Sequence, residues 1–582
     1  MNKTRLRPPN YRLRLYTVLM VMALAGTGLV ARAVDVQVLR SDFYQEQGAE
    51  RFLRDVPIPA YRGAILDRNG EPLAVSTPVA SLWAVPSELI EARERLPELA
   101  TALGIGVEPL MQRLVQRSGR EFVYLKRHVS PDEANAVMAL ELPGVNVQRE
   151  FRRYYPAGEV VAHVIGYTNI DDRGQEGLEL AFEDWLAGQP GSKRVIQDRR
   201  GQRVENVDLL RPAQPGKDLT LSLDRRIQYL AYRELKAAIA EHDASSGSVV
   251  VLDASNGEVL AMVNFPSFNP NARQRRSGGS VKNAAVTDVF EPGSVVKSFT
   301  VAAALESGKY EPDTKIDTAP GTMPVSYHIV RDIRNFGLLD VTGIITKSSN
   351  VGATKLAFAV PDEHLYDMFH RFGFGAITGS GFPGESPGVL PDYRRWGVLE
   401  KATLSYGYGL STTALQLATA YAALAHGGRM RPPTFVKDGA MPDTAVIDPA
   451  LAQTLLGMLE TVTGPGGSGG KAAVAHYRVA GKTGTSRKAG AQGYQSRYIS
   501  LFAGMAPVSN PRLVGVVVIN DPKGAVYYGG LVSAPVFGKV IGGALRLLDV
   551  PPDGADIDTL LAVDPAQQLE AAAEAVGGAT PP

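Results

Sequence analysis

Cysteine is absent from the 582-residue sequence. Without thiols the chain cannot form a disulfide, a cysteine nucleophile, an iron–sulfur cluster, a cysteine-ligated zinc site or a lipid-modified N-terminal cysteine. The eight histidines include no HExxH pair, so a zincin-type site is not expected either. We therefore expect neither a bound metal nor a cofactor.

A large excess of charge of either sign is also missing. Lys and Arg total 61 and Asp and Glu total 60, so the formal net charge is +1. This balance provides no general attraction to nucleic acid. Hydrophobic residues make up 45% and charged residues 21%, which is typical of a globular protein rather than a disordered chain or a transporter with many spans. At roughly 100–200 residues per domain, the length predicts about two to four domains.

Long uncharged runs are rare, and the one that matters lies near the N-terminus. Residues 15–31 are uncharged and mostly apolar, and they follow five cations: Lys3, Arg5, Arg7, Arg12 and Arg14. The positive-inside rule places residues 1–14 in the cytoplasm and the chain beyond Arg32 on the other side. We predict an uncleaved transmembrane anchor at residues 15–31. The alternatives are a signal peptide cleaved near Ala31-Arg32-Ala33 and a buried soluble helix.

The rest of the chain divides at a proline- and glycine-rich break, residues 211–216. Before it, two short apolar runs flank an Asn-Gly turn and predict a β-hairpin around residues 62–74. After it come predicted strands, then mostly helices, then strands, an order typical of an α+β domain. We expect an N-terminal domain over residues 34–215 and an α+β domain over residues 216–550. Residues 551–582, rich in Ala, Pro, Gly and acids, are expected to be a disordered tail.

The first of three short motifs is EPGSVVK at residues 291–297. Pro-Gly ends one element and Ser294 opens an apolar helical pattern, so Lys297 lies one turn further along the same face. A lysine whose pKa is lowered by burial can take the proton of a serine and make it a nucleophile. The alternative is an N-cap serine and a solvated lysine. A second S-x-x-K match, at residues 468–471, lies in a glycine run, where we expect a flexible loop.

The second motif is Ser348-Ser349-Asn350, 54 residues after the first. A hydroxyl and an amide two residues apart on a tight turn can enter one cleft. There the hydroxyl can relay a proton and the amide can bind a peptide group of a substrate. A similar triplet at residues 267–269 lies in a proline-rich loop, and a single triplet of this kind most often reflects turn formation.

The third motif is Lys482-Thr483-Gly484-Thr485. The strand-like run from Tyr498 onward can pair with it, which predicts an edge strand. The glycine permits close approach of a ligand to the backbone, and the lysine and hydroxyls can bind a carboxylate. The alternative is a solvated basic strand end. A phosphate-binding P-loop is excluded because the glycine that it requires is replaced at position 476 by histidine.

In this order the three motifs resemble the active-site set of the penicillin-recognising serine acyltransferases. Within that superfamily the chain resembles the class B penicillin-binding proteins. Their N-terminal motifs resemble residues 62–70, 153–166 and 174–179, and residues 404–418 resemble those of the division-specific (FtsI-type) branch. No N-terminal glycosyltransferase signature is found, which disfavours a bifunctional class A enzyme.

The resemblance implies a single-pass inner-membrane protein with its catalytic domain in the periplasm. That domain would have the penicillin-binding, β-lactamase-like transpeptidase fold, attached to an elongated pedestal of the dimerisation type. Its activity would be that of a D,D-transpeptidase that cross-links peptidoglycan stem peptides ending in D-Ala-D-Ala at the division septum. β-Lactams, a membrane glycosyltransferase and other division proteins would be its partners, and nucleic acid would not.

The resemblance also implies a role for each motif residue. Ser294 would form the acyl-enzyme and Lys297 would act as its base, while Ser348 and Asn350, rather than Ser349, would relay the proton and orient the substrate. The backbone N–H groups of Ser294 and Thr485 would form the oxyanion hole. The substrate carboxylate would be bound by Thr483 and Thr485 beside Gly484, with charge supplied by Lys482.

Other functions remain open from the sequence. One is a hydrolase of the same fold, a D,D-carboxypeptidase or β-lactamase, in which water replaces the acceptor amine. Another is a catalytically silent penicillin sensor or division scaffold. A structural membrane protein with chance motifs is a third. The N-terminal motifs are compatible with either a scaffold or a partner surface.

Overall fold

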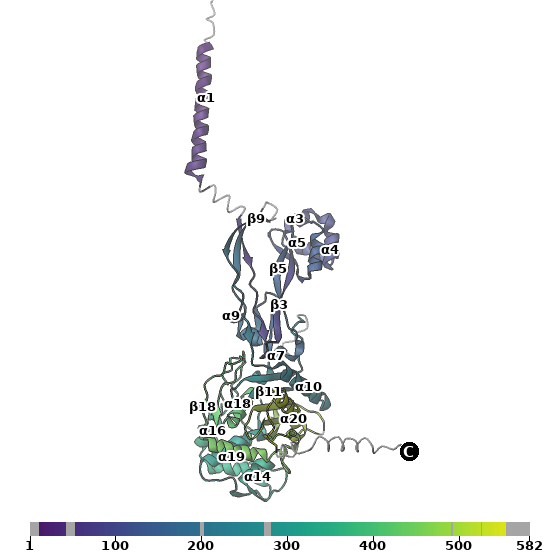
Figure 1. Cartoon of the computed structure of the whole chain (residues 1–582), viewed down its shortest axis with the longest axis vertical. Helices are drawn as coiled ribbons and strands as arrows, with labels where there is room; N and C mark the ends of the chain where they lie inside the picture. The colour runs from purple at the N-terminus through teal and green to yellow at the C-terminus, as the bar shows by residue number, and fades with distance from the viewer. Residues whose placement is uncertain are drawn as a thin grey trace, which may run out of the picture. The chain divides into compact units, whose positions relative to one another are not determined.

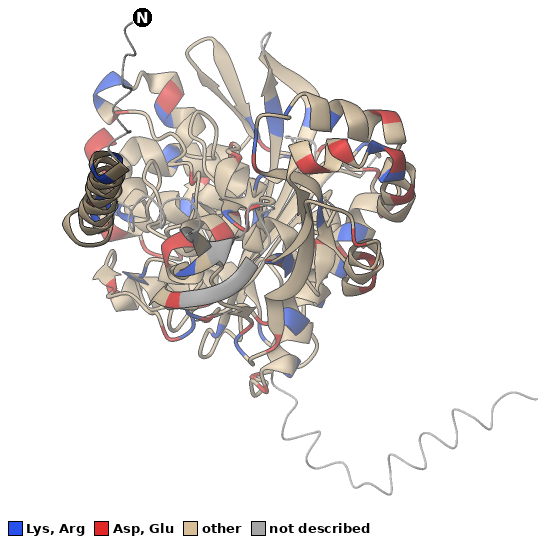
Figure 2. Cartoon of the chain, turned by 90° about the horizontal axis from the view of Figure 1, so that it is seen from above, with Lys and Arg blue, Asp and Glu red and all other residues tan. Residues whose placement is uncertain are grey.

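The computed structural model describes residues 11–41, 43, 53–197, 203–272, 281–490, 493–524 and 526–554 (Figure 1). Most of the predicted cytoplasmic tail, residues 1–10, lies outside the described residues, as does nearly all of the predicted C-terminal tail. In the view of Figure 2, basic and acidic residues are interspersed along the described ribbon, in keeping with the net charge.

The apolar run near the N-terminus forms one continuous helix. Helix α1 (Tyr11–Val34) continues into a short π-helical turn (Asp35–Leu39), and none of its side chains is buried. Its mean hydropathy of 1.8 and its length make residues 11–39 a candidate membrane span. Helix α20 (Gly529–Leu547) also has the length and composition of a span, but more than half of it is buried in a folded core.

The chain forms two compact units, and the smaller contains residues 1–61, 78–151 and 188–215. One part of it is an antiparallel sheet of β1 (Leu53–Ile58), β8 (Gly191–Gln197) and β9 (Arg203–Arg211). In another part, β4 (Val123–Val129) pairs with the end of β3 (Pro72–Ala84). A leucine-rich core is enclosed there by four helices: α3 (Pro86–Glu91), α4 (Leu96–Leu103), α5 (Val107–Val115) and α6 (Pro131–Met138).

The larger unit is built on an antiparallel sheet in the order β12-β11-β21-β20-β19. Its strands are β11 (Ser246–Asp253), β12 (Val259–Phe265), β19 (Ala480–Gly490), β20 (Gly493–Ala506) and β21 (Leu513–Asn520). Successive residues of β11 alternate between two apolar cores, Val249 and Val251 on one face and Val250 and Leu252 on the other. This explains why the strand reads as a continuous apolar run.

Helices cover both faces of this sheet. Helices α10 (Arg225–Glu241) and α20 pack on one face, and α18 (Ala414–Ala425) packs on the other. Beside α18 lie α13 (Lys297–Glu306), α14 (Val341–Lys347), α15 (Asn350–Ala359), α16 (Asp362–Arg371), α17 (Val398–Leu404) and α19 (Pro449–Glu460). The α+β class is therefore confirmed, with β19 at the sheet edge where the helical layer meets it.

Two segments of the predicted N-terminal domain group instead with the larger unit: residues 62–77 and 152–187. The predicted hairpin is present, since β2 (Ile65–Leu66) pairs with the start of β3, and β2 also pairs with β10 (Leu219–Thr220). The unit boundary therefore differs from the single break near residue 215, because strand pairing joins these distant segments to the α+β fold.

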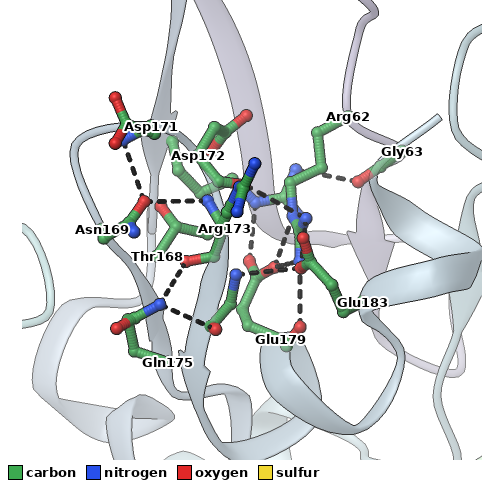
Figure 3. Close-up of polar contacts among 12 residues, drawn as sticks. Arg62, Gly63, Thr168, Asn169, Asp171, Asp172, Arg173, Gln175, Glu179 and Glu183 are labelled. Carbon is green, nitrogen blue, oxygen red and sulfur yellow. Dashed lines mark hydrogen bonds and ion pairs between the residues drawn. The ribbon is translucent and has the colours of Figure 1, made fainter. Parts of the chain in front are cut away.

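A buried ion network fixes these segments to one another (Figure 3). Glu179, fully buried, accepts from Arg62 Nη2 at 2.7 Å and from Arg153 Nε at 2.6 Å. Arg62 Nη1 also pairs with Glu183 Oε2 at 2.7 Å, and Arg153 Nη1 donates to Gly63 O at 2.8 Å. Each of the three N-terminal motifs contributes one of the buried charges, so these motif residues form a scaffold.

Candidate active site

Ser294 lies on a tight turn between the sheet edge and the helical layer. It is in a 3₁₀ turn, residues 293–296, that leads directly into α13. The Gly293 N–H donates to Gly407 O at 3.0 Å, and a Cβ at Gly407 would lie 2.1 Å from Gly293 O. From α18, the Tyr421 hydroxyl donates to Val295 O at 2.8 Å. The backbone on both sides of the serine is thus fixed by the segment 404–418 and by α18.

Lys297 connects the first motif to the second. Its side chain is fully buried. Its Nζ donates to Asn350 Oδ1 at 2.7 Å, to Ser348 O at 2.6 Å and to Ser348 Oγ at 3.2 Å. The structure therefore brings together Lys297, Ser348 and Asn350, which are about 50 residues apart in the sequence, one helical turn from Ser294.

Two buried lysines differ in their electrostatics. Burial, together with the positive charge of Lys482, lowers the pKa of Lys297 well below its usual value. This confirms the expected direction, and it favours the neutral amine that can accept a proton. Burial also lowers the pKa of Lys482 to about 7, so near neutral pH its side chain is only partly protonated in the unliganded protein. Its Nζ donates to the Thr483 carbonyl at 3.3 Å, and no ion pair with a carboxylate is found for it among the described residues.

The second motif lies at the junction of two helices. Ser348 ends α14 in a left-handed conformation with φ of 60°, and Ser349 is the N-cap of α15, accepting from the Gly352 N–H at 2.9 Å. The side chain of Ser349 is thereby directed away from Lys297. Ser348 and Asn350 are left on the side of the base, as the sequence analysis expected.

Asp332 was missed by the sequence analysis. Its carboxylate accepts from Ser349 Oγ at 2.6 Å and from the backbone N–H groups of Asn350 and Val351. It therefore stabilises the N-terminus of α15, where negative charge is favoured. No local pattern marks this residue, because it precedes the motif by 16 residues and meets it only in the folded chain.

The third motif lies on β19, the edge strand that the sequence predicts. Its register pairs Ser486 with Ile499 and Arg487 with Tyr498. Thr485 Oγ1 accepts from the Gly529 N–H at 3.0 Å, at the start of α20. A Cβ at Gly484 would lie 3.0 Å from Pro292 O, so the glycine allows β19 to approach the nucleophile turn.

The second S-x-x-K match is not a free loop. Ser468 Oγ lies 2.8 Å from Thr483 Oγ1, and Lys347 Nζ donates to Gly466 O at 2.7 Å. Part of the expected loop at residues 468–471 forms a 3₁₀ turn, Gly470–Ala472. A Cβ at Gly467 would lie 2.1 Å from Val462 O and one at Gly469 would lie 3.0 Å from the Phe502 ring, so the glycines allow close packing that places a further hydroxyl beside the third motif.

This arrangement can perform acyl transfer. A serine, a buried lysine of lowered pKa, a hydroxyl next to that lysine and a second lysine beside two threonines surround one turn. Such a set can activate a nucleophile and bind a carboxylate. Among the described residues, no group of three His, Asp or Glu side chains is placed to hold a metal ion.

Comparison with protein families gives two matches. Residues 247–542 match the penicillin-binding protein transpeptidase domain, and residues 57–221 match the penicillin-binding protein dimerisation domain. Together the two matched ranges contain all the motif residues discussed above.

Curated relatives match nearly the whole chain. The peptidoglycan D,D-transpeptidase FtsI of Escherichia coli is 44% identical over 551 residues, covering 94% of this chain and 93% of the relative. The probable peptidoglycan D,D-transpeptidase PbpC of Pseudomonas aeruginosa is 42% identical over 546 residues, covering 94% and 96%.

Solved structures agree with these matches. Penicillin-binding protein 3 of Mycobacterium tuberculosis, complexed with aztreonam, is 30% identical with a TM-score of 0.67, covering 86% of this chain and 98% of that one. The transpeptidase domain of Burkholderia pseudomallei penicillin-binding protein 3 is 42% identical with a TM-score of 0.53, covering 57% and 97%.

Proposed function

The chain belongs to the class B penicillin-binding proteins, which join a dimerisation domain to a transpeptidase domain, and we propose that it cross-links peptidoglycan stem peptides at the division septum. Its activity is that of a D,D-transpeptidase acting on a peptide that ends in D-Ala-D-Ala. The observation that carries this proposal is the buried Lys297, which contacts Ser348 and Asn350 one turn from Ser294.

In the first step Ser294 Oγ attacks the carbonyl carbon between the two terminal D-Ala residues. Neutral Lys297 takes the hydroxyl proton, and the tetrahedral oxyanion is stabilised by the N–H groups of Ser294 and Thr485. The C–N bond then breaks, and Ser348 relays the proton to the leaving amine. Free D-Ala departs, and the donor peptide remains as an ester on Ser294.

In the second step an amine of a neighbouring strand attacks this ester. The proton of the amine returns through Lys297 to Ser294 Oγ, a new peptide bond forms, and the enzyme is regenerated. Asn350 orients a peptide group of the donor. Its terminal carboxylate binds at Lys482, Thr483 and Thr485 during the first step, and that charge raises the pKa of Lys482 and keeps it protonated.

A donor–acceptor assay tests the activity. A synthetic stem peptide ending in D-Ala-D-Ala is incubated with the protein and an amine acceptor, and products are followed by mass spectrometry. We expect release of D-Ala and a cross-linked product, both lost in Ser294→Ala. Release of D-Ala with only hydrolysed donor would instead assign a D,D-carboxypeptidase, and no release would contradict both enzymes.

We further propose that α1 crosses the inner membrane once, with residues 1–14 in the cytoplasm and the folded units in the periplasm. The five cations before the apolar run support this orientation. A membrane glycosyltransferase and other division proteins are the proposed partners, because residues 404–418 resemble the division-specific (FtsI-type) branch. A fluorescent fusion should concentrate at the septum, and even labelling of the side wall would contradict the septal role.

A further inference from the structure

Two adjoining cavities lie beyond the third motif, and we refer to them together as the groove. The larger, about 510 Å³, and the smaller, about 340 Å³, are both lined by Val289, Phe290, Lys488 and Ile499. The smaller is also lined by Glu291, three residues before Ser294. The groove therefore starts beside the catalytic turn and runs under the end of β19 to the end of the sheet.

The floor of the larger cavity is polar, although the same sheet face is apolar elsewhere. Asn520 Nδ2 donates to Ser246 Oγ at 2.9 Å, and Ser248 Oγ donates to Asn264 Oδ1 at 2.6 Å. Ser248 and Asn264 are buried. Further along β11, Val250 continues this face into the apolar core. Buried polar side chains joined in this way line a cavity of the size of a ligand site.

Lys488 is the cation of this groove. Its Nζ donates to Asn520 Oδ1 at 2.9 Å and forms no ion pair with a carboxylate of the described residues. Burial, with the nearby Arg497 guanidinium, lowers the pKa of Lys488, and the carboxylates of Asp521 and Asp288 oppose this shift without bonding to its ammonium group. By contrast Lys282, which lines the same cavity, is paired with Asp288 at 2.6 Å. A carboxylate entering the groove would find an unpaired, partly desolvated ammonium group.

The proposed binding of the donor peptide at the third motif determines which part of that peptide lies near Lys488. With the terminal carboxylate at Thr483 and Thr485, an extended donor antiparallel to β19 has its upstream residues beyond Thr485. At about 3.3 Å per residue, Lys488 lies about 10 Å further along. The Arg487 N–H is already bonded to the Tyr408 hydroxyl at 3.3 Å, so it is not available to pair with the donor, and we infer that the upstream residues turn toward the groove from this point.

We propose that this groove binds the donor stem peptide upstream of its D-Ala-D-Ala terminus, and that Lys488 recognises a carboxylate on that upstream part. The inference rests on the proposed transpeptidase function and names a specificity determinant for it. The ligand is thus an acidic peptide. Its carboxylate would be on the residue two or three positions upstream of the scissile bond and would bind Lys488.

Two matched synthetic donor peptides test whether Lys488 recognises an upstream carboxylate. Two peptides ending in D-Ala-D-Ala carry either a glutamate or a glutamine upstream, and kcat/KM for D-Ala release is measured at pH 7.5. We expect the wild type to prefer the acidic donor about tenfold. Lys488→Met should abolish the preference and Lys488→Arg should retain much of it. Lys523→Met, which removes an exposed lysine beside Asp243, should leave the ratio as in the wild type.

The outcomes separate the two claims. Equal use of both donors by the wild type, or an equal loss for both donors in Lys488→Met, would overturn the role of Lys488 and leave the transpeptidase proposal standing. If neither donor releases D-Ala, the proposed function itself fails. Thermal unfolding of each variant identifies those that are simply misfolded.

Discussion

At the scale of single residues, Lys297 and Lys482 have different tasks although both are buried. Lys297→Arg should reduce penicillin acylation to near zero, because arginine cannot deprotonate and act as a base. Lys482→Arg keeps a positive charge and should retain part of the activity, with the loss mainly in substrate binding. The second-order rate constant of acylation measures both. A near wild-type rate for Lys297→Arg would exclude Lys297 as the base.

The pH dependence of penicillin acylation follows from the lowered pKa of Lys297. Acylation requires neutral Lys297, so its rate should fall as the pH drops through the pKa of that residue. Because the pKa is lowered, the midpoint of this fall should lie well below the usual lysine pKa of 10.5. A pH–rate profile of benzylpenicillin acylation measures this midpoint, and a midpoint at the usual lysine pKa would contradict the role of Lys297.

Asp332 should act through the second motif without touching the substrate. Asp332→Asn replaces a charged acceptor of three hydrogen bonds by a neutral amide, which should misplace Ser348 and Asn350. We expect about a 10- to 100-fold lower acylation rate, since hydrogen bonds to charged groups are worth ~1.5–3 kcal/mol. An unchanged rate constant in a folded variant would show that the carboxylate is dispensable.

Replacing Ser468 should affect substrate binding without removing the nucleophile. Ser468→Ala should retain covalent penicillin labelling, because Ser294 remains, while weakening binding through loss of the contact to Thr483. The expected result is an intact adduct in the mass spectrum, with a several-fold lower kcat/KM for D-Ala-D-Ala donors. Loss of the adduct would give Ser468 a more direct role.

At the scale of elements, the buried Glu179 joins three segments that the sequence separates widely. Glu179→Gln leaves Arg62 and Arg153 without their shared buried carboxylate. Removing one partner of a buried ion pair typically costs ~3–5 kcal/mol. We expect a comparable loss in the free energy of unfolding of the α+β unit, measured by denaturant titration. Lys315→Met, which breaks an exposed pair with Asp340, should cost less than ~1 kcal/mol.

The parts of the fold and of the candidate site that the sequence could predict are those that depend on local contacts. The Ser294–Lys297 spacing and the β2–β3 hairpin depend on neighbours within a few residues, so local patterns were enough. Asp332 and Ser468 meet their partners only through tertiary contacts, and no spacing marks them. The grouping of residues 62–77 and 152–187 with the α+β unit depends on strand pairing and buried charges far apart in the sequence, which patterning along the chain cannot show.

At the scale of the whole molecule, the anchor should remain attached. Helix α1 extends well beyond the predicted residues 15–31, which provides more length for crossing a bilayer. N-terminal sequencing of protein from membranes should therefore begin at or next to Met1. A start near Val34 would identify a cleaved signal peptide instead, and protein released by salt alone would argue against a span.

The most direct test of whether this chain is a serine acyltransferase built around Ser294 is intact mass spectrometry after benzylpenicillin treatment. We expect a stable adduct of one penicillin on the wild type and none on Ser294→Ala. Rapid turnover of the drug without an adduct would indicate a β-lactamase, and no reaction would indicate a silent scaffold. An adduct that persists on folded Ser294→Ala would contradict the assignment of the nucleophile.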